Sequence, residues 1–227
     1  MKRRNFFCLL SKMSEIVSEE PEIDTNTVPD IVVGRLPLYL RALSEMALAD
    51  KHFTSSQELA DALGISSAQI RKDLSHFGEF GKQGTGYAVL GLRDHLRNIL
   101  QLDREWPLIV VGAGHIGSAV ANYTGFAERG FRVVAVFDNN PARVGDGAGT
   151  HTVYAMNDLN AIVEKYKVRH AMLTVPAEAA QTVAEQVIAV GIRAILNYAP
   201  TTLAVPVGVH VEYIDPVLHL QRMTYYL

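Results

Sequence analysis

The chain has 227 residues, of which 48% are hydrophobic and 20% charged, and this composition is typical of a globular protein with one or two domains. Its formal net charge of −3 at pH 7 gives no global sign of nucleic-acid binding, so any DNA contact must come from a local patch. The lone Cys8 excludes an intramolecular disulfide and a cysteine-built zinc site, and no apolar run approaches the roughly 18 residues of a membrane span, so we expect a cytoplasmic protein.

Residues 1–30 are predicted to form a disordered acidic tail. Every charge between Met13 and Asp30 is negative, and Pro21 and Pro29 interrupt the stretch. The segment has no helical period, so it offers no apolar face to a core.

Residues 31–103 are predicted to form a winged helix-turn-helix domain that binds DNA. After a first helix over Pro37–Ala49, two capping-box patterns follow about 11 residues apart: Ser55 with Glu58, and Ser66 with Gln69. Gly64 lies between them and permits the left-handed conformation of a tight turn. Two short helices joined by such a turn are typical of a helix-turn-helix.

The second of these helices, expected over Ser67–Phe77, is the candidate recognition helix. Ile70, Leu74 and Phe77 recur at helical spacing and would hold it to the core. The other side carries hydrogen-bonding and cationic groups suited to base edges and phosphates, and we expect these to contact DNA: Ser67, Gln69, Arg71, Lys72, Ser75 and His76. An ordinary helical hairpin with a solvated basic face is the alternative.

The glycine-rich stretch Gly78–Tyr87 follows, and we interpret it as a wing with Lys82 and Gln83 at its DNA-contacting tip. A flexible linker is the alternative. A helical period then runs over Tyr87–Leu102, and the stretch Asp103–Pro107 marks the domain boundary.

Residues 107–214 are predicted to form a Rossmann-like dinucleotide-binding domain. An apolar strand ends at Val111, and Gly112, Gly114 and Gly117 then fit G-x-G-x-x-G at the start of a helix. A second strand ends at Asp138, about 20 residues on, where an acid that binds a ribose belongs. A glycine turn that only packs is the alternative.

Strands and helices alternate through this domain, which predicts an α/β fold with a doubly wound parallel sheet. The expected strands are Leu108–Val111, Phe131–Phe137, Thr152–Tyr154, Arg169–Val175, Arg193–Asn197 and His210–Ile214, and the expected helices are His115–Glu128, Leu159–Tyr166 and Glu178–Val190. Ligands bind at strand C-terminal ends in such sheets. The candidate cofactor-binding residues are therefore Gly112, Ala113, Gly114, His115, Ile116, Gly117, Asp138, Thr174, Val175, Pro176, Asn197, Tyr198 and Ala199.

Residues 215–227 are predicted to form a C-terminal helix that needs a partner surface. Asp215 is suited to cap it, with Pro216 in the first turn. Its side chains are largely apolar or aromatic. The helix is expected to dock either on its own domain or on a second subunit.

Taken together, these motifs resemble the Rex family of redox-sensing transcriptional repressors from about Leu36 to the C-terminus. The matching pieces are Tyr39-Leu40-Arg41, Gln69 to Gly78, Gly84 to Tyr87, Gly112 to Gly117, Leu173 to Pro176 and Ile195 to Pro200. The resemblance implies a homodimer of winged-helix and Rossmann domains with the C-terminal helix swapped between subunits. It also implies repression at a palindromic operator of genes for respiration, fermentation or NADH reoxidation, relieved when NADH binds.

The resemblance also assigns roles to single residues. Arg41, Tyr123 and Asp215 match positions that exchange polar contacts between the swapped pieces as the ligand changes, and so would couple ligand to DNA. Gly112, Gly114, Gly117 and Asp138 match the NAD(H)-binding positions. Pro216 departs from the bulky apolar residue that some members place near the nicotinamide.

Asp138 predicts a preference for NAD(H) over NADP(H). The carboxylate would accept hydrogen bonds from the adenosine ribose and repel a 2′-phosphate, and Asn139 and Asn140 follow where an NADP site often has arginine. We expect this repulsion to outweigh any contact to the distant Arg143.

Two other functions compete with a repressor. An NAD-dependent dehydrogenase would need a substrate domain and an acid/base group, and little chain remains for either, so we expect no catalytic residue. A sensor of CoA or another nucleotide on the same fold would keep the regulatory role and change the ligand. The histidines show no metal-ligand spacing, so no metal site is expected.

Overall fold

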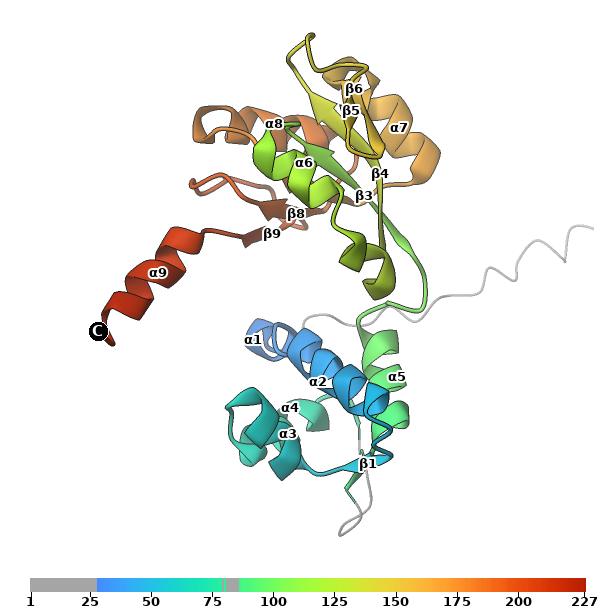
Figure 1. Ribbon diagram of the computed structural model, residues 1–227, viewed down its shortest axis with the longest axis vertical. Helices are drawn as coiled ribbons and strands as arrows, with labels where there is room; N and C mark the ends of the chain where they lie inside the picture. The colour runs from blue at the N-terminus through green and yellow to red at the C-terminus, as the bar shows by residue number, and fades with distance from the viewer. Residues whose placement is uncertain (1–27, 79, 81–85) are drawn as a thin grey trace, which may run out of the picture. The chain divides into compact units, whose positions relative to one another are not determined.

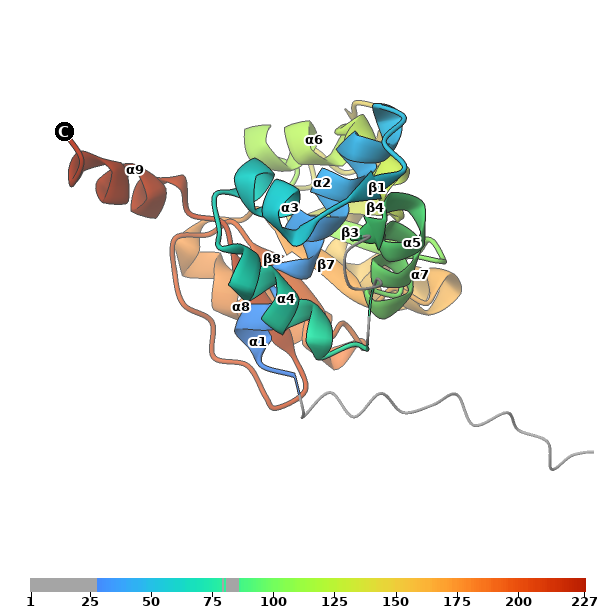
Figure 2. The same ribbon diagram turned by 90° about the horizontal axis from the view of Figure 1, so that it is seen from below.

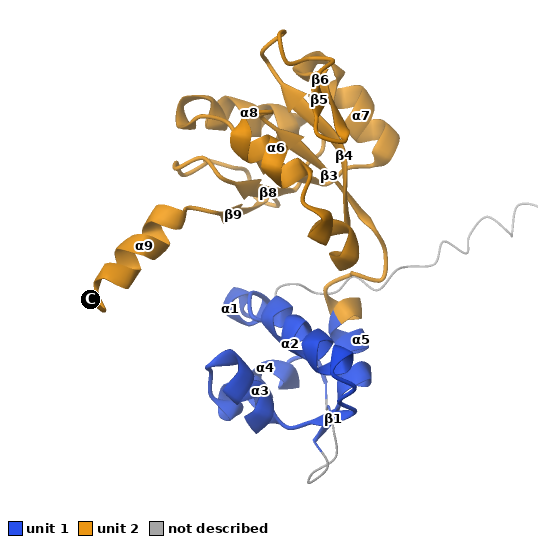
Figure 3. Ribbon diagram, viewed as in Figure 1, with its two compact units in different colours: residues 1–96 blue, residues 97–227 orange. Residues whose placement is uncertain are grey.

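The computed structural model describes residues 28–78, 80 and 86–227. The chain divides into two compact units, Met1–Leu96 and Arg97–Leu227 (Figure 3). None of the helices in the described part of the chain has the length and apolar character that crossing a bilayer requires.

The first unit is a small helical domain with one short strand pair (Figure 1). Its elements are α1 (Asp30–Val33), α2 (Leu36–Leu48), β1 (Phe53–Thr54), α3 (Ser56–Leu63), α4 (Ser67–Ser75), β2 (Tyr87–Ala88) and α5 (Val89–Ile99), within which the division between the units falls. The core is built from side chains at helical spacing, among them Leu36, Tyr39, Leu43, Leu59, Ile70 and Leu96.

The helix-turn-helix is formed by α3 and α4. Ser55 caps α3 with a complete capping box, because Glu58 N–H donates to its hydroxyl and the Glu58 carboxylate accepts from Ser55 N–H. Gly64 ends α3 at φ +69°, the left-handed conformation that the tight turn requires. Ser66 then caps α4, but the Gln69 side chain turns to Asp73, so the second predicted box forms only in half.

The expected helix over Tyr87–Leu102 begins later than predicted, because its first residues form a strand. Tyr87 and Ala88 pair antiparallel with β1, and α5 starts only at Val89. Gly86 adopts φ +75°, and a Cβ there would lie 2.3 Å from the Thr54 carbonyl oxygen, so this approach requires glycine. The predicted wing-tip residues, Lys82 and Gln83, lie outside the described residues.

The second unit contains a seven-stranded sheet with the order β5-β6-β4-β3-β7-β8-β9. The strands are β3 (Trp106–Val111), β4 (Phe131–Asp138), β5 (Gly147–Ala148), β6 (His151–Ala155), β7 (His170–Leu173), β8 (Ala194–Asn197) and β9 (His210–Tyr213). Every pair is parallel except β5 with β6. The chain leaves β3 toward β4 on one side and returns to β7 on the other, so the predicted doubly wound sheet is confirmed.

Helices cover both faces of this sheet (Figures 1 and 2). Leu108 and Val110 face the layer that includes α6 (His115–Ala121), whereas Ile109 and Val111 face α7 (Leu159–Tyr166) and α8 (Ala177–Ala189). Strands buried on both faces carry continuous apolar runs. The run Leu108–Val111 of β3 was therefore recognisable in the sequence as a central strand.

The single helix expected over His115–Glu128 is two elements. The α-helix ends at Ala121, and the short 3-10 helix η1 (Thr124–Arg129) follows. Asn122 lies at the break, where its side-chain amide donates to the carbonyls of Ser118 and Ala148 and its oxygen accepts from Thr150 N–H. These bonds tie the end of α6 to the turn before β6, a tertiary contact that the helical period did not reveal.

The C-terminal helix α9 (Pro216–Thr224) begins as predicted, with the Asp215 carboxylate accepting from Val217 N–H at 2.9 Å. None of its residues is buried. Val217, Leu218, Leu220 and Met223 are between 55% and 61% exposed, and both views show α9 extending away from the sheet of its own unit (Figures 1 and 2). Of the two expected docking surfaces, its own unit does not provide one.

Candidate functional site

A cleft of about 880 Å³ opens at the C-terminal ends of β3, β4 and β7, the switch point of the sheet. Most of the cofactor-binding residues expected from the sequence line it, namely Gly112, Gly114, His115, Ile116, Asp138, Thr174, Val175, Pro176 and Tyr198. The cleft has the position and size of a small-molecule site in an open α/β sheet.

The other expected residues, Ala113, Gly117, Asn197 and Ala199, support the walls rather than line the cleft. Ala113 N–H donates to Asp138 at 2.8 Å. Asn197 is buried, and its amide donates to the carbonyls of Ala199 and Thr201 while its oxygen accepts from Ala199 N–H. Asn197 therefore shapes the turn that presents Tyr198.

Each glycine of the motif has its own geometric reason. Gly112 adopts φ +103°, and a Cβ there would lie 2.6 Å from the Thr174 carbonyl oxygen. A Cβ on Gly117 would lie 1.8 Å from the Gly112 carbonyl oxygen, so α6 packs this closely only without a side chain. Gly114 has nothing within 4 Å of its Cβ position, so its backbone faces open space that a phosphate would fill.

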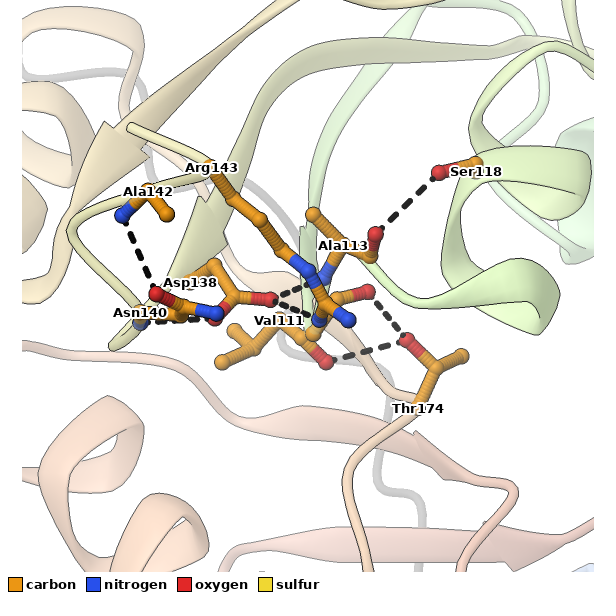
Figure 4. Close-up of polar contacts among 9 residues, drawn as sticks. Val111, Ala113, Ser118, Asp138, Asn140, Ala142, Arg143 and Thr174 are labelled. Carbon is orange, nitrogen blue, oxygen red and sulfur yellow. Dashed lines mark hydrogen bonds and ion pairs between the residues drawn. The ribbon is translucent and has the colours of Figure 1, made fainter. Parts of the chain in front are cut away.

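Thr174 fixes the glycine turn to the neighbouring strand (Figure 4). Its N–H donates to the Val111 carbonyl at 2.9 Å, and its hydroxyl lies 2.8 Å from the Gly112 carbonyl oxygen. These bonds fix the position of the glycine turn where it lines the cleft.

Asp138 lies at the end of β4 with its side chain 5% exposed, and it accepts three hydrogen bonds (Figure 4). Oδ1 accepts from Asn140 N–H at 2.8 Å, and Oδ2 accepts from Ala113 N–H at 2.8 Å and from Arg143 Nη1 at 3.0 Å. Burial acts to raise the pKa of Asp138, but these donors outweigh it and hold the pKa below its usual value. The group is therefore a carboxylate at neutral pH.

Arg143 was wrongly taken as distant from this carboxylate. A turn brings it back, because Ala142 N–H donates to the Asn140 side chain and Arg143 N–H donates to the Asn140 carbonyl. The Asn-Asn-Pro run after Asp138 was the sequence signal for that turn.

The wall that α8 contributes to the cleft was not predicted from the sequence. Ala179, Thr182, Val183 and Gln186 line the cleft, together with Met156 and Pro200. Ala179, Val183 and Gln186 recur at i, i+4 and i+7 and so share one face of the helix. Loops follow the predicted strand ends, so the sequence predicted only loop residues and the start of α6 at the cleft.

The DNA-contacting residues predicted for the recognition helix lie on α4 and at its end. Arg71, Lys72, Ser75 and His76 are exposed, at positions that bring them onto one side of the helix. Ser67 is partly buried. Arg71 donates to the Ser56 hydroxyl of α3 at 2.9 Å, so its guanidinium is held between the two helices.

Gln69 faces a buried ionic cluster that was not predicted from the sequence. The Asp73 carboxylate, fully buried, accepts two hydrogen bonds from Arg35, at 2.6 and 2.8 Å. It also accepts from the Tyr39 hydroxyl at 2.6 Å and from the Gln69 amide at 2.7 Å. Burial acts to raise the pKa of Asp73, and the hydrogen bonds from Arg35, Tyr39 and Gln69 lower it further than burial raises it.

The three residues proposed to couple ligand to DNA each have a partner on their own element or beside it. Arg41 lies 4.0 Å from Glu45 on α2, Tyr123 accepts from Arg129 of η1 at 3.0 Å, and Asp215 caps α9. Tyr123 and Arg41 are exposed, and so accessible to another surface.

Comparison with known proteins divides the chain in a similar way. Residues 27–75 match the family model "Putative DNA-binding protein N-terminus". Residues 103–201 match the family model "CoA binding domain". The first match contains the helix-turn-helix, and the second contains the cleft.

Full-length relatives share both parts. A redox-sensing transcriptional repressor Rex from Roseiflexus sp. (strain RS-1) is 49% identical over 199 residues, which are 88% of this chain and 90% of the relative. The Rex of Streptomyces griseus subsp. griseus is 41% identical over 92% of this chain and 83% of its own length.

Solved structures of a Rex-family repressor named RSP are also similar. The complex of RSP with β-NAD⁺ and operator DNA has a TM-score of 0.82 at 37% identity, covering 88% of this chain and 92% of that one. The complex of RSP with β-NADH has a TM-score of 0.80 at 34% identity, covering 88% and 94%.

Proposed function

This chain belongs to the Rex family of redox-sensing transcriptional repressors, and we propose that it binds operator DNA through α4 and releases it when NADH occupies the cleft. The observation that carries the proposal is the presence in one chain of a helix-turn-helix and a cleft with a G-x-G-x-x-G turn. The DNA-binding domain would span residues 31–103 and the ligand-binding domain residues 107–214.

The cleft has the groups that a dinucleotide requires. The open space at Gly114 admits a pyrophosphate, and the ionised Asp138 is placed to accept from the adenosine ribose. NADH and NAD⁺ differ in charge and planarity only at the nicotinamide, so discrimination between them must arise around that ring. Tyr198 and Pro176, on the loops after β8 and β7, are the proposed neighbours of the ring.

The ligand acts as a regulator and not as a substrate in this proposal. The Rex relatives are repressors, and the dinucleotide would shift the dimer between arrangements rather than transfer a hydride. CoA is the second candidate ligand, favoured by the family model that covers the cleft. Its adenosine ribose carries a 3′-phosphate, which Asp138 would repel.

The DNA-bound form is proposed to be a homodimer acting in the cytoplasm, where operator DNA is found. Two copies of α4 would read the half-sites of a palindromic operator, and α9, whose apolar side chains are exposed, would pack on the partner subunit. Arg41, Tyr123 and Asp215 would exchange contacts across that interface. The target genes would be those of respiration, fermentation or NADH reoxidation.

The substitution Gly114→Ala tests the ligand site without disturbing the fold. The added methyl group meets no protein atom within 4 Å, but it occupies the space that the pyrophosphate would enter. We expect operator binding to be retained and the NADH concentration needed for release to rise at least about tenfold, the effect of losing roughly 1.4 kcal/mol of ligand affinity.

Gly91→Ala is the matched control, because Gly91 lies in α5 and its added Cβ would make only an ordinary 3.7 Å contact with Ala88. This variant should respond to NADH as the wild type does. If Gly114→Ala released operator DNA at the same NADH concentration as the wild type, the proposed ligand site would be wrong.

A further inference from the structure

The Asp138 carboxylate has little capacity left for a ligand. A carboxylate offers about four acceptor positions, and three of those on Asp138 are taken by Ala113 N–H, Asn140 N–H and Arg143. The remaining position is on Oδ1, which accepts only from Asn140. A ribose diol, which offers two hydroxyl donors, therefore finds one vacancy unless Arg143 moves.

Arg143 is the only one of these three donors that is a side chain. Its guanidinium lies at the rim of the cleft, with the side chain 48% exposed, and the contact with Asp138 uses one nitrogen of a group with several donors. The two backbone donors are fixed by the glycine turn and by the turn after β4, whereas a half-exposed arginine has freedom to reorient.

We propose that Arg143 sets the choice between a free and a 2′-phosphorylated adenosine ribose by exchanging between Asp138 and the ligand. This inference rests on the proposed dinucleotide site. A ligand with a free diol donates to the open position on Oδ1, and Arg143 remains paired with Asp138. A ligand with a 2′-phosphate offers Arg143 a more highly charged acceptor and draws it away.

The exchange is unfavourable for the phosphorylated ligand. Once Arg143 leaves, Asp138 keeps its two backbone donors but loses its counter-charge, and an anion lies beside the nearly buried carboxylate. NADH is therefore preferred, and the margin is set by Arg143 as well as by Asp138. Arg143 lowers the discrimination that the bare carboxylate would give, because it accompanies the phosphate.

Opposite effects are expected from the two single substitutions. Arg143→Ala removes the only cation beside the carboxylate among the described residues, so NADPH binding should weaken by about tenfold more than NADH binding does. Asp138→Ala frees Arg143 for the phosphate, so the ratio of NADPH to NADH affinity should rise by about tenfold or more.

The double substitution distinguishes exchange from two independent contributions. With Asp138 absent, Arg143 acts only on the phosphate, so removing it from the Asp138→Ala protein should abolish the part of the gained NADPH affinity that the freed arginine supplies. The effect of Arg143→Ala should therefore be larger in the Asp138→Ala background than in the wild type.

Arg132→Ala is the control. Arg132 lies on β4, its side chain is 49% exposed, and like Arg143 it forms an ion pair. Its partner is Glu105, just before β3, at the opposite end of the strands from the cleft. Affinities of the full-length proteins for NADH and NADPH are measured by the fluorescence of the bound reduced nicotinamide. Arg132→Ala should leave the affinity ratio unchanged.

The possible outcomes distinguish the role of Arg143 from the proposed function. A wild-type protein that binds NADH, with an affinity ratio unaltered by Arg143→Ala in both backgrounds, would overturn the role of Arg143 and leave the proposed function intact. A wild-type protein that binds neither dinucleotide would overturn both.

Discussion

At the scale of single residues, the two buried carboxylates Asp73 and Asp138 are held by the same physical means. Each is almost inaccessible to solvent, and each is kept ionised by several donors that include an arginine. Asp73 has four side-chain hydrogen bonds and no capacity left, whereas Asp138 keeps one acceptor position. The first arrangement suits a structural role and the second a binding role.

Replacing Asp73 with asparagine should destabilise the first unit strongly. The change keeps the shape of the side chain but leaves Arg35, whose side chain is 20% exposed, without its counter-charge. Breaking a buried pair in this way costs about 3 kcal/mol or more. Thermal unfolding followed by circular dichroism measures the loss, and Asp94→Asn, which breaks the exposed pair with Arg93, should cost less than about 1 kcal/mol.

The stability difference between the wild type and Asp73→Asn should depend on pH. Because the folded-state pKa of Asp73 is lowered, its contribution is complete above the unfolded pKa of about 3.9 and is lost as the pH falls through the folded value. The stability difference between the wild type and Asp73→Asn should therefore be constant near neutral pH and shrink in acid. A difference that grew in acid would show that the carboxylate is not the stabilising form.

At the scale of elements, α4 combines a core face with a face proposed to meet DNA. Ile70, Asp73 and Leu74 are buried, and Arg71 and Lys72 are exposed between them. Because Asp73 also holds Gln69, the buried cluster fixes the N-terminal half of the helix, which is where a recognition helix contacts bases.

Removing one cation from α4 should weaken operator binding without unfolding the protein. For Lys72→Ala we expect weaker binding to specific and random duplexes alike, and a salt slope smaller by about 1, because one phosphate contact is lost. Fluorescence anisotropy at several salt concentrations measures both. Lys165→Ala on α7 removes the same charge far along the sequence and should change neither; a similar loss for the two variants would argue against α4.

The elements were largely predictable, because they depend on patterns within a few residues of each other. The caps at Ser55, Ser66 and Asp215, the left-handed Gly64 and the apolar run into Gly112 all had local signals. The predicted bounds of helices and strands were wrong where distant parts of the chain meet. The strand at Tyr87 exists only because β1 pairs with it, and the end of α6 at Ala121 is fixed by Asn122 contacting Ala148.

The site was predictable in part for the same reason. The glycine turn and Asp138 follow strand ends and were recognisable from spacing. The ion pair with Arg143 depends on how a turn folds back, and the cluster of Asp73 joins residues 34 and 38 positions apart. Local periodicity carries no information about such pairs.

At the scale of the whole molecule, α9 predicts an assembly. A helix with four apolar residues more than half exposed is unfavourable in water, and packing on a second subunit would remove that surface. In the proposed dimer the ligand-binding unit of one chain is therefore linked to its partner through the helix that follows Asp215.

Introducing a charge into α9 should dissociate the dimer. Leu220→Glu would bury a carboxylate in the proposed interface, so sedimentation velocity should give a monomer at concentrations where the wild type is dimeric. His219→Glu places the same charge on the side of α9 that carries none of these apolar residues and should leave the dimer intact. If both variants sedimented as the wild type does, α9 would not be the dimer contact.

NADH binding and operator binding are proposed to oppose each other in this one protein. Fluorescence anisotropy of a palindromic operator, selected from random duplexes with the wild-type protein, is titrated with NADH, NAD⁺ and NADPH at fixed salt. We predict that NADH releases the DNA at the lowest concentration and weakens binding by about 5- to 150-fold at saturation, the usual range of coupling between two sites. Stable operator binding that no dinucleotide changes would contradict the proposed coupling between the two sites.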